Sequence, residues 1–120
     1  METPQSAHSL ISSNRIHGTG VFSTTGKSIG SVDHLVVDKV SGRIFYVVIS
    51  FGGFLGLGKN HYPLPWSALR YDTSLMGYVT EVTEDQLRNA PEFSDDVWRD
   101  RDWETRLHRH YGARTYWGLM

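Results

Sequence analysis

The longest run of strand-forming residues in this chain is GSVDHLVVDKVSGRIFYVVISF, residues 30–51. Its two arms, residues 35–37 and 44–49, are rich in β-branched and aromatic side chains, which fit a pleated and partly buried surface. Between them, Gly42 can supply the positive φ that closes a short loop. The run therefore predicts a β-hairpin. Both faces of the second arm are apolar, which is typical of a central strand in a small barrel or a sandwich.

The flanking sequence predicts further strands around this hairpin. Residues 21–38 alternate between strand-forming runs and a polar turn, which indicates a first hairpin that leads into the central one. Pro63 and Pro65 each lack a ladder donor, so residues 61–66 are expected to form an edge strand that ends in a turn. Residues 69–82 predict a last hairpin with one solvated face.

The hydrophobic period changes after residue 82, which predicts two helices. Thr83 and Gln86 fit a capping box, and Pro91 prevents that helix from continuing. From about residue 100, Trp103 and Leu107 fall on one face of a second helix. Gly112 is placed to end the second helix. Trp98 lies off the apolar face of that helix.

Composition limits the class of protein. The 120 residues suffice for one core, and residues 1–9 are polar and aperiodic enough to predict a disordered arm. The net charge of −1, from 12 basic and 13 acidic residues, gives no global field toward nucleic acid or anionic lipid. The chain has no cysteine and no apolar run near the ~20 residues that span a bilayer. We therefore expect a cytoplasmic protein without a membrane span.

One segment matches part of a phosphate-binding P-loop. Gly53, Gly58 and Lys59 have the required spacing after a strand. However, Asn60 replaces the Ser or Thr that would hold magnesium, and the prolines that follow prevent the helix on which the phosphate would sit. We interpret the segment as a flexible loop.

The six histidines predict no metal site. His108 and His110 are two residues apart, so on a helix they point to different sides. His34 and His61 are expected on different strands, with no third ligand at diagnostic spacing. No cofactor is predicted.

The acidic residues between positions 95 and 104 do not fit a calcium loop, because the required glycine is missing. Arginines interleave with them, which favours a solvated, ion-paired helix surface. No serine sits in a Gly-x-Ser-x-Gly elbow. The sequence therefore predicts no catalytic residues, and the protein is not expected to be an enzyme.

A nucleic-acid surface is the weaker alternative. A small barrel could present a stacking platform, but basic residues are sparse around the candidate aromatic side chains. The candidates for this platform are Tyr46, Phe51, Phe54, Tyr62 and Arg70.

Several motifs occur in a characteristic order. They are Gly26-Lys27-Ser28-Ile29-Gly30, Leu35-Val36-Val37-Asp38, Gly42-Arg43-Ile44, Gly52-Gly53-Phe54-Leu55-Gly56, Leu64-Pro65-Trp66-Ser67-Ala68-Leu69 and Gln86-Leu87. This order resembles the PRC-barrel family, over residues 10–91. The family includes the cytoplasmic domain of the photosynthetic reaction-centre H subunit, the C-terminal domain of a ribosome-maturation factor and many small free-standing bacterial proteins.

The resemblance implies a mainly β fold, a small PRC-type β-barrel over residues 10–91, with two short helices after the strands and a helical extension over residues 92–120. It also implies a domain that acts by binding proteins, without catalytic residues to carry over. We expect no counterpart here of the membrane helix that the reaction-centre subunit carries, nor of the separate N-terminal barrel of the maturation factor. The functions of these two relatives are therefore not transferred directly to this chain.

We therefore expect a protein-interaction or assembly module, with an RNA- or ribosome-associated module as the alternative. Apolar and aromatic groups that a monomer would struggle to bury are the expected contact residues, because such anchors dominate interface energies. The expected contact residues are Phe54, Leu55, Leu57, Trp98, Tyr116 and Trp117. A homodimer formed through these segments is the specific expectation.

Overall fold

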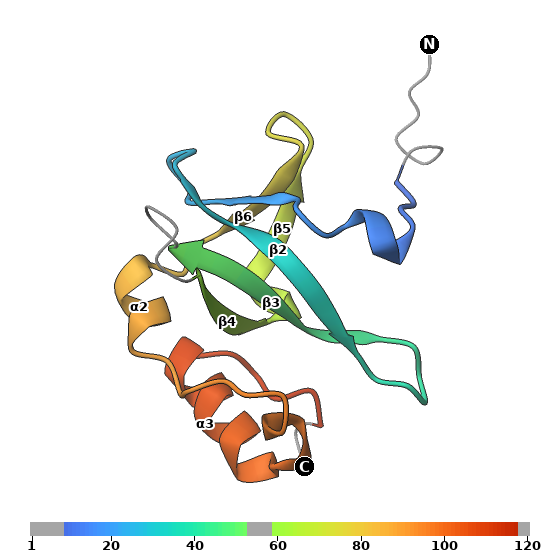
Figure 1. The fold of residues 1–120 in the computed structure, drawn as a ribbon, viewed down its shortest axis with the longest axis vertical. Helices are drawn as coiled ribbons and strands as arrows, with labels where there is room; N and C mark the ends of the chain where they lie inside the picture. Colours follow the sequence, from blue (N-terminus) through green and yellow to red (C-terminus); the bar gives the residue numbers. More distant parts are fainter. Residues whose placement is uncertain (1–8, 53–58, 118–120) are drawn as a thin grey trace.

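A computed structural model describes residues 9–52 and 59–117 (Figure 1). Six strands form one sheet in the order β4-β3-β2-β1-β6-β5, and all neighbours are antiparallel except β1 and β6. The strands are β1 Gly20–Phe22, β2 Ser28–Val37, β3 Ile44–Gly52, β4 Lys59–Pro65, β5 Leu69–Asp72 and β6 Gly77–Thr80. The sheet curls into a half-barrel with β4 and β5 at its margins, which confirms the predicted fold class.

The helices follow the sheet in the chain. They are α2 Glu84–Arg88 and α3 Arg101–Tyr111. Three short 3-10 turns lie elsewhere in the chain: η1 Ser13–Arg15 before the sheet, η3 Trp66–Ala68 between β4 and β5, and η4 Val97–Arg99 between α2 and α3. The capping box is confirmed, because Thr83 Oγ1 accepts from Gln86 N while Gln86 Oε1 accepts from Thr83 N. Gly112 ends α3 in the left-handed region at φ 66°. Within residues 9–52 and 59–117, no helix is long and apolar enough to cross a membrane.

The predicted central hairpin is β2–β3. Its strands pair with Leu35 opposite Val47, and Gly42 in the turn has a φ of 79°. The register shifts between Val32 and His34, which indicates a bulge at that point of β2.

Glycines allow neighbouring strands to approach closely where the sheet curls. A Cβ on Gly30 of β2 would collide with the carbonyl oxygen of Ser50 on β3. A Cβ on Gly77 of β6 would lie 2.6 Å from the carbonyl oxygen of Gly20 on β1. These two positions therefore need glycine for lack of space.

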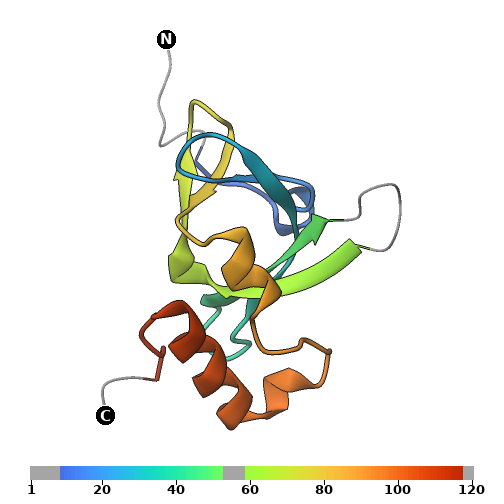
Figure 2. The same cartoon turned by 90° about the vertical axis from the view of Figure 1, so that its left-hand side faces the viewer.

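Strand β3 is buried on both faces, as predicted. Val47 and Ile49 are fully buried in the core inside the half-barrel. Tyr46 faces the other way and packs in a second core with Trp103 and Leu107 of α3. Figure 2 shows α3 below the curled sheet, whereas α2 lies at its open side, with Leu87 in the core inside the half-barrel. The second apolar face of β3 is therefore covered by the C-terminal part of the chain.

Strand β4 is the edge strand that its prolines predict. Pro63 pairs with Val48 and Pro65 with Tyr46, and no strand of residues 9–52 or 59–117 pairs with the other side of β4. Both prolines are fully buried, and α3 contacts this strand.

Candidate interaction surface

The C-terminal segment is joined to the sheet by an aromatic cluster, the C-terminal seam, formed by Phe45, Tyr46, Trp98, Tyr116 and Trp117. The rings of Tyr46 and Trp98 have centroids 4.8 Å apart, and Tyr116 stacks on Phe45 at 3.8 Å. Trp98, Tyr116 and Trp117 are partly buried. The expectation that a single chain could hardly bury these three side chains does not hold. The outer face of β3 receives Trp98 and Tyr116, and the ring of Trp117 packs against Tyr116 and His108.

The other expected contact residues, Phe54, Leu55 and Leu57, lie outside the described residues, as does most of the P-loop-like segment. The role of all six residues in binding a partner stays a prediction.

A buried polar network crosses the seam. The Tyr46 hydroxyl donates to Glu104 Oε1 at 2.7 Å and lies 2.8 Å from His108 Nε2. His108 Nδ1 lies 3.0 Å from the carbonyl oxygen of Arg114, which can only accept, so Nδ1 carries the proton. Glu104 is 5% exposed. The expectation that the acidic residues form a solvated surface is therefore wrong for Glu104, because Tyr46 supplies a buried partner.

The ionisable groups of this network are tuned by burial. Burial raises the pKa of Tyr46, reinforced by its hydrogen bond to Glu104. Burial lowers the pKa of His108, with the Arg114 carbonyl acting in the opposite direction. Burial is the main cause that raises the pKa of Tyr116 to about 12, and the neighbouring Glu104 acts in the same direction. A ligand cannot reach Tyr46 or His108, which are 2% and 4% exposed, so the network holds α3 on the sheet rather than forming an open reaction site.

Asp33, at the bulge of β2, brings together histidines that are far apart in the sequence. Its Oδ2 lies 2.6 Å from His34 Nδ1, and its Oδ1 lies 3.5 Å from His61 Nε2 on β4. His17 Nδ1 donates to the carbonyl oxygen of Asp33 at 2.8 Å. In the part of the chain that the structure describes, no three His, Asp or Glu side chains are arranged to hold a metal ion.

Asp33 is expected to make stability depend on pH in acid. The hydrogen bond from His34 lowers the pKa of Asp33 from its ordinary value of 3.8, so its contribution is present above pH 3.8 and is lost as the pH falls through the lower, folded value. The site is partly exposed, which limits the contribution to about 1 kcal/mol or less. Urea unfolding between pH 5 and 2.5 checks this, because Asp33→Asn should flatten the pH dependence. An equal slope in both proteins contradicts it.

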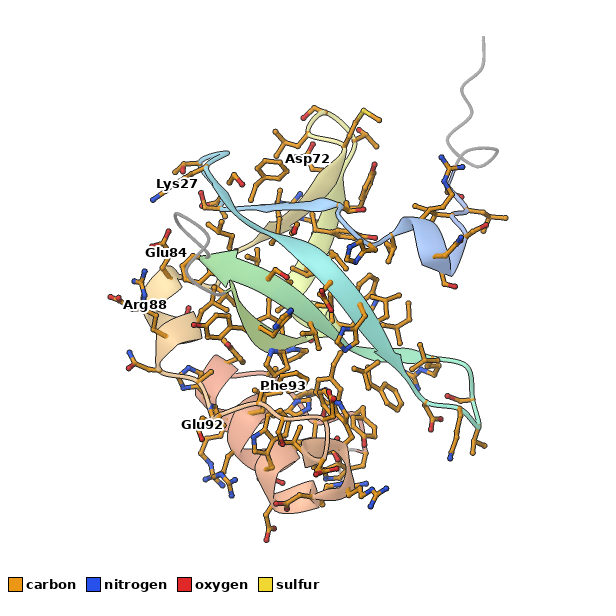
Figure 3. All side chains as sticks on the ribbon, viewed as in Figure 1. Lys27, Asp72, Glu84, Arg88, Glu92 and Phe93 are labelled. Atoms are coloured by element: carbon orange, nitrogen blue, oxygen red, sulfur yellow. The ribbon has the colours of Figure 1, made fainter. Side chains whose placement is uncertain are left out.

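Three exposed side chains, Tyr71, Leu75 and Met76, lie together on the β5–β6 hairpin, at the end of the molecule away from α3. They are here called the hairpin patch. Their exposed fractions are 49%, 36% and 75%. Figure 3 shows Asp72 at this end of the molecule, away from α3. Among the described residues, the outer side of β5 pairs with no strand, since β5 is the last in the sheet. The patch therefore lies beside a free sheet edge.

The hairpin is held rigid by its own hydrogen bonds. Asp72 Oδ1 accepts from Ser74 N at 2.8 Å, from Ser74 Oγ at 2.6 Å and from Leu75 N at 3.3 Å. Met76 adopts a φ of 52°, which is rare for a residue with a large side chain. Tyr71 packs edge-on against Tyr78 at 5.2 Å. These contacts order the backbone of the hairpin that carries the patch.

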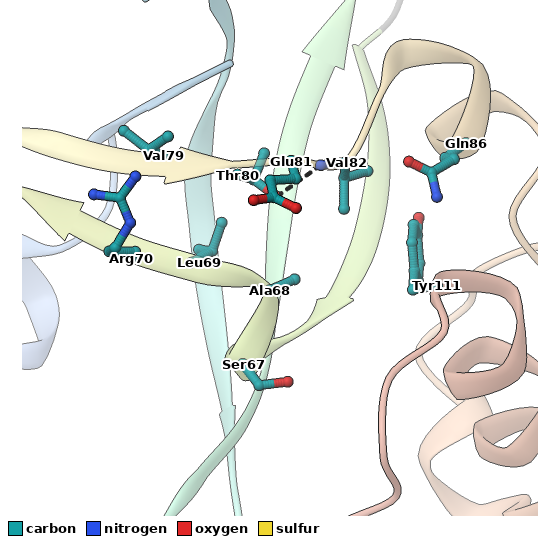
Figure 4. A pocket seen from close by; sticks show the side chains of 10 residues that line it. All are labelled: Ser67, Ala68, Leu69, Arg70, Val79, Thr80, Glu81, Val82, Gln86 and Tyr111. Atoms are coloured by element: carbon teal, nitrogen blue, oxygen red, sulfur yellow. Dashed lines mark hydrogen bonds between the residues drawn. The ribbon is translucent and has the colours of Figure 1, made fainter. Parts of the chain in front are cut away.

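A groove of about 500 Å³ lies next to β5 (Figure 4). Its lining includes Ser67, Arg70, Glu81, Gln86 and Tyr111. Burial raises the pKa of Tyr111, whose hydroxyl is buried and has no hydrogen-bond partner among the described residues. The groove therefore has mixed polar and apolar walls, and one buried hydroxyl in its lining has no hydrogen-bond partner among the described residues.

Two of the five side chains of the nucleic-acid platform considered above, Tyr46 and Phe51, are buried. Tyr46 is 2% exposed and Phe51 is 8% exposed. Tyr46 faces α3, whereas Phe51 belongs to the core inside the half-barrel. These rings cannot stack on bases together, because they lie buried on opposite faces of β3.

Sequence reasoning missed the hairpin patch, although a signal was present. Leu75 and Met76 are apolar residues in a turn that is otherwise polar. Turns favour Gly, Asn, Asp and Ser, so two large apolar residues before Gly77 could have marked a binding surface.

No curated protein matches this chain. The model of the PRC-barrel domain matches residues 8–87, which include all six strands and most of α2. This chain therefore belongs to the PRC-barrel domain family.

Proposed function

We propose that this protein is a cytoplasmic, non-catalytic interaction or assembly module whose protein partner binds at the β5 margin. The PRC-barrel domain is an interaction- and assembly-type module and is generally non-catalytic. The observation that carries the proposal is the rigid, apolar hairpin patch beside a free sheet edge. Exposed apolar surface of this kind marks protein contacts, and free edges pair with added strands.

The two margins of the sheet support β5 as the binding edge. β4 contains Pro63 and Pro65, which remove two donors, and it is contacted by α3. β5, with the sequence Leu69-Arg70-Tyr71-Asp72, contains no proline. Of the two margins, β5 is therefore the one in which every residue carries a backbone donor.

Site-specific photo-crosslinking tests the proposal. A photoreactive residue at Met76 should give a discrete protein adduct in lysate of the source cells, and the adduct should survive nuclease. The matched control is Val40, which is 90% exposed on the β2–β3 turn and should give little adduct. Equal adducts from both positions would contradict the proposal. Adducts that vanish with nuclease would instead support the RNA-associated alternative.

A further inference from the structure

We infer that the partner at the β5 margin is a second copy of this chain, with the two β5 strands paired antiparallel and Tyr71 opposite Tyr71. The inference rests on the proposed function and names the partner of that surface. Such a contact is self-complementary and closes as a twofold dimer, since the same strand serves on both sides. It would join the two half-barrels into one continuous sheet.

The charges of β5 select this register. With Tyr71 opposite its own copy, Arg70 of each chain faces Asp72 of the other. Arg70 and Asp72 are two residues apart in the strand, so they lie on the same face, and both cross-strand pairs are of opposite charge. A shift by one residue would place Arg70 opposite either Tyr71 or Thr73 and would lose both pairs.

The same register brings the hairpin patch to the groove. Residues 73, 74 and 75 of one chain come level with residues 69, 68 and 67 of the other. Ser67, Ala68 and Leu69 line the groove, so the turn that carries Leu75 reaches its mouth. The apolar tip of each copy is thereby placed next to a hollow of the other, which explains the exposure of both in the single chain.

Disulfide trapping tests the register in the full chain, which has no native cysteine. Directly opposed residues in an antiparallel pair have Cα atoms about 4.5–5.5 Å apart, within the range that a disulfide spans. With oxidised glutathione at micromolar protein, Tyr71→Cys should form a covalent dimer at least about tenfold faster than the exposed control Val40→Cys. Equal rates for the two variants would overturn the inference.

A charge reversal gives an independent measurement. Arg70→Asp would place like charges opposite each other, so sedimentation velocity should show dimerisation weakened by about tenfold or more. Arg99→Asp, an exposed change on η4, should leave dimerisation unaltered. Unchanged dimerisation in Arg70→Asp, or a monomeric unmodified protein at every concentration, would overturn the inference. A monomer that still forms the Met76 adduct with another protein would leave the proposed function standing, whereas loss of both would remove both.

Discussion

Trp103→Ala is expected to lower the free energy of unfolding by about 3–5 kcal/mol, the usual cost of removing a large aromatic side chain from a core. Trp103 is 4% exposed and packs with Tyr46 and Leu107. Its Nε1 also donates to the carbonyl oxygen of Glu92 at 2.8 Å, so the change leaves that acceptor without its partner. Urea unfolding followed by far-ultraviolet circular dichroism measures the effect.

Trp117→Ala provides the matched control for this change. Trp117 is partly buried, and its ring lies 3.9 Å from the Arg101 guanidinium carbon. A cation–π contact at a partly exposed site is worth about 1 kcal/mol, so this variant should lose much less stability. Equal losses in the two variants would mean that α3 is not anchored through Trp103.

Gly30→Ala is expected to cost at least about 3 kcal/mol, because the added methyl group has no room. It would collide with the carbonyl oxygen of Ser50, a backbone atom that cannot rotate away. To accept the methyl group, β2 would have to separate from β3 at the point where their ladder is formed. The same unfolding experiment measures this loss, and a variant that fails to fold under native conditions agrees with it.

Gly42→Ala separates crowding from backbone strain. A methyl group at Gly42 meets nothing within 4 Å, but the residue has a φ of 79°. Such a conformation costs about 1–2 kcal/mol for a residue with a side chain. Gly30→Ala should therefore be the more damaging change, and the opposite order would show that β2 and β3 are not closely apposed at Ser50.

Much of the fold was predictable from the sequence because its signals are local. The capping box at Thr83 and the glycine at position 112 each act within a few residues of a helix end. Pro63 and Pro65 exclude β4 from the interior of a sheet, because a proline has no backbone N–H to donate to a second neighbouring strand. The apolar face of α3 follows from helical spacing, and Trp103 and Leu107 are buried as it predicts.

The candidate surface was less predictable because it depends on contacts between distant residues. Tyr46 and Glu104 are 58 positions apart, and no spacing rule links a strand tyrosine to that carboxylate. The apolar outer face of β3 indicated that something must cover it, but the pattern did not identify Trp98 and Tyr116 as the cover. The free edge of β5 likewise emerges only from the strand order.

The double burial of β3 has a consequence for dividing this protein into fragments. The family match ends at residue 87, whereas the side chains that cover the outer face of β3 come from residues 93–116. A recombinant fragment cut at the end of the match would expose Tyr46 and its apolar neighbours to water, which favours aggregation. A proteolytic nick in the connector between α2 and η4 would have a milder result, because α3 would stay bound to the sheet through the seam. The natural unit for expression and labelling therefore extends through Trp117.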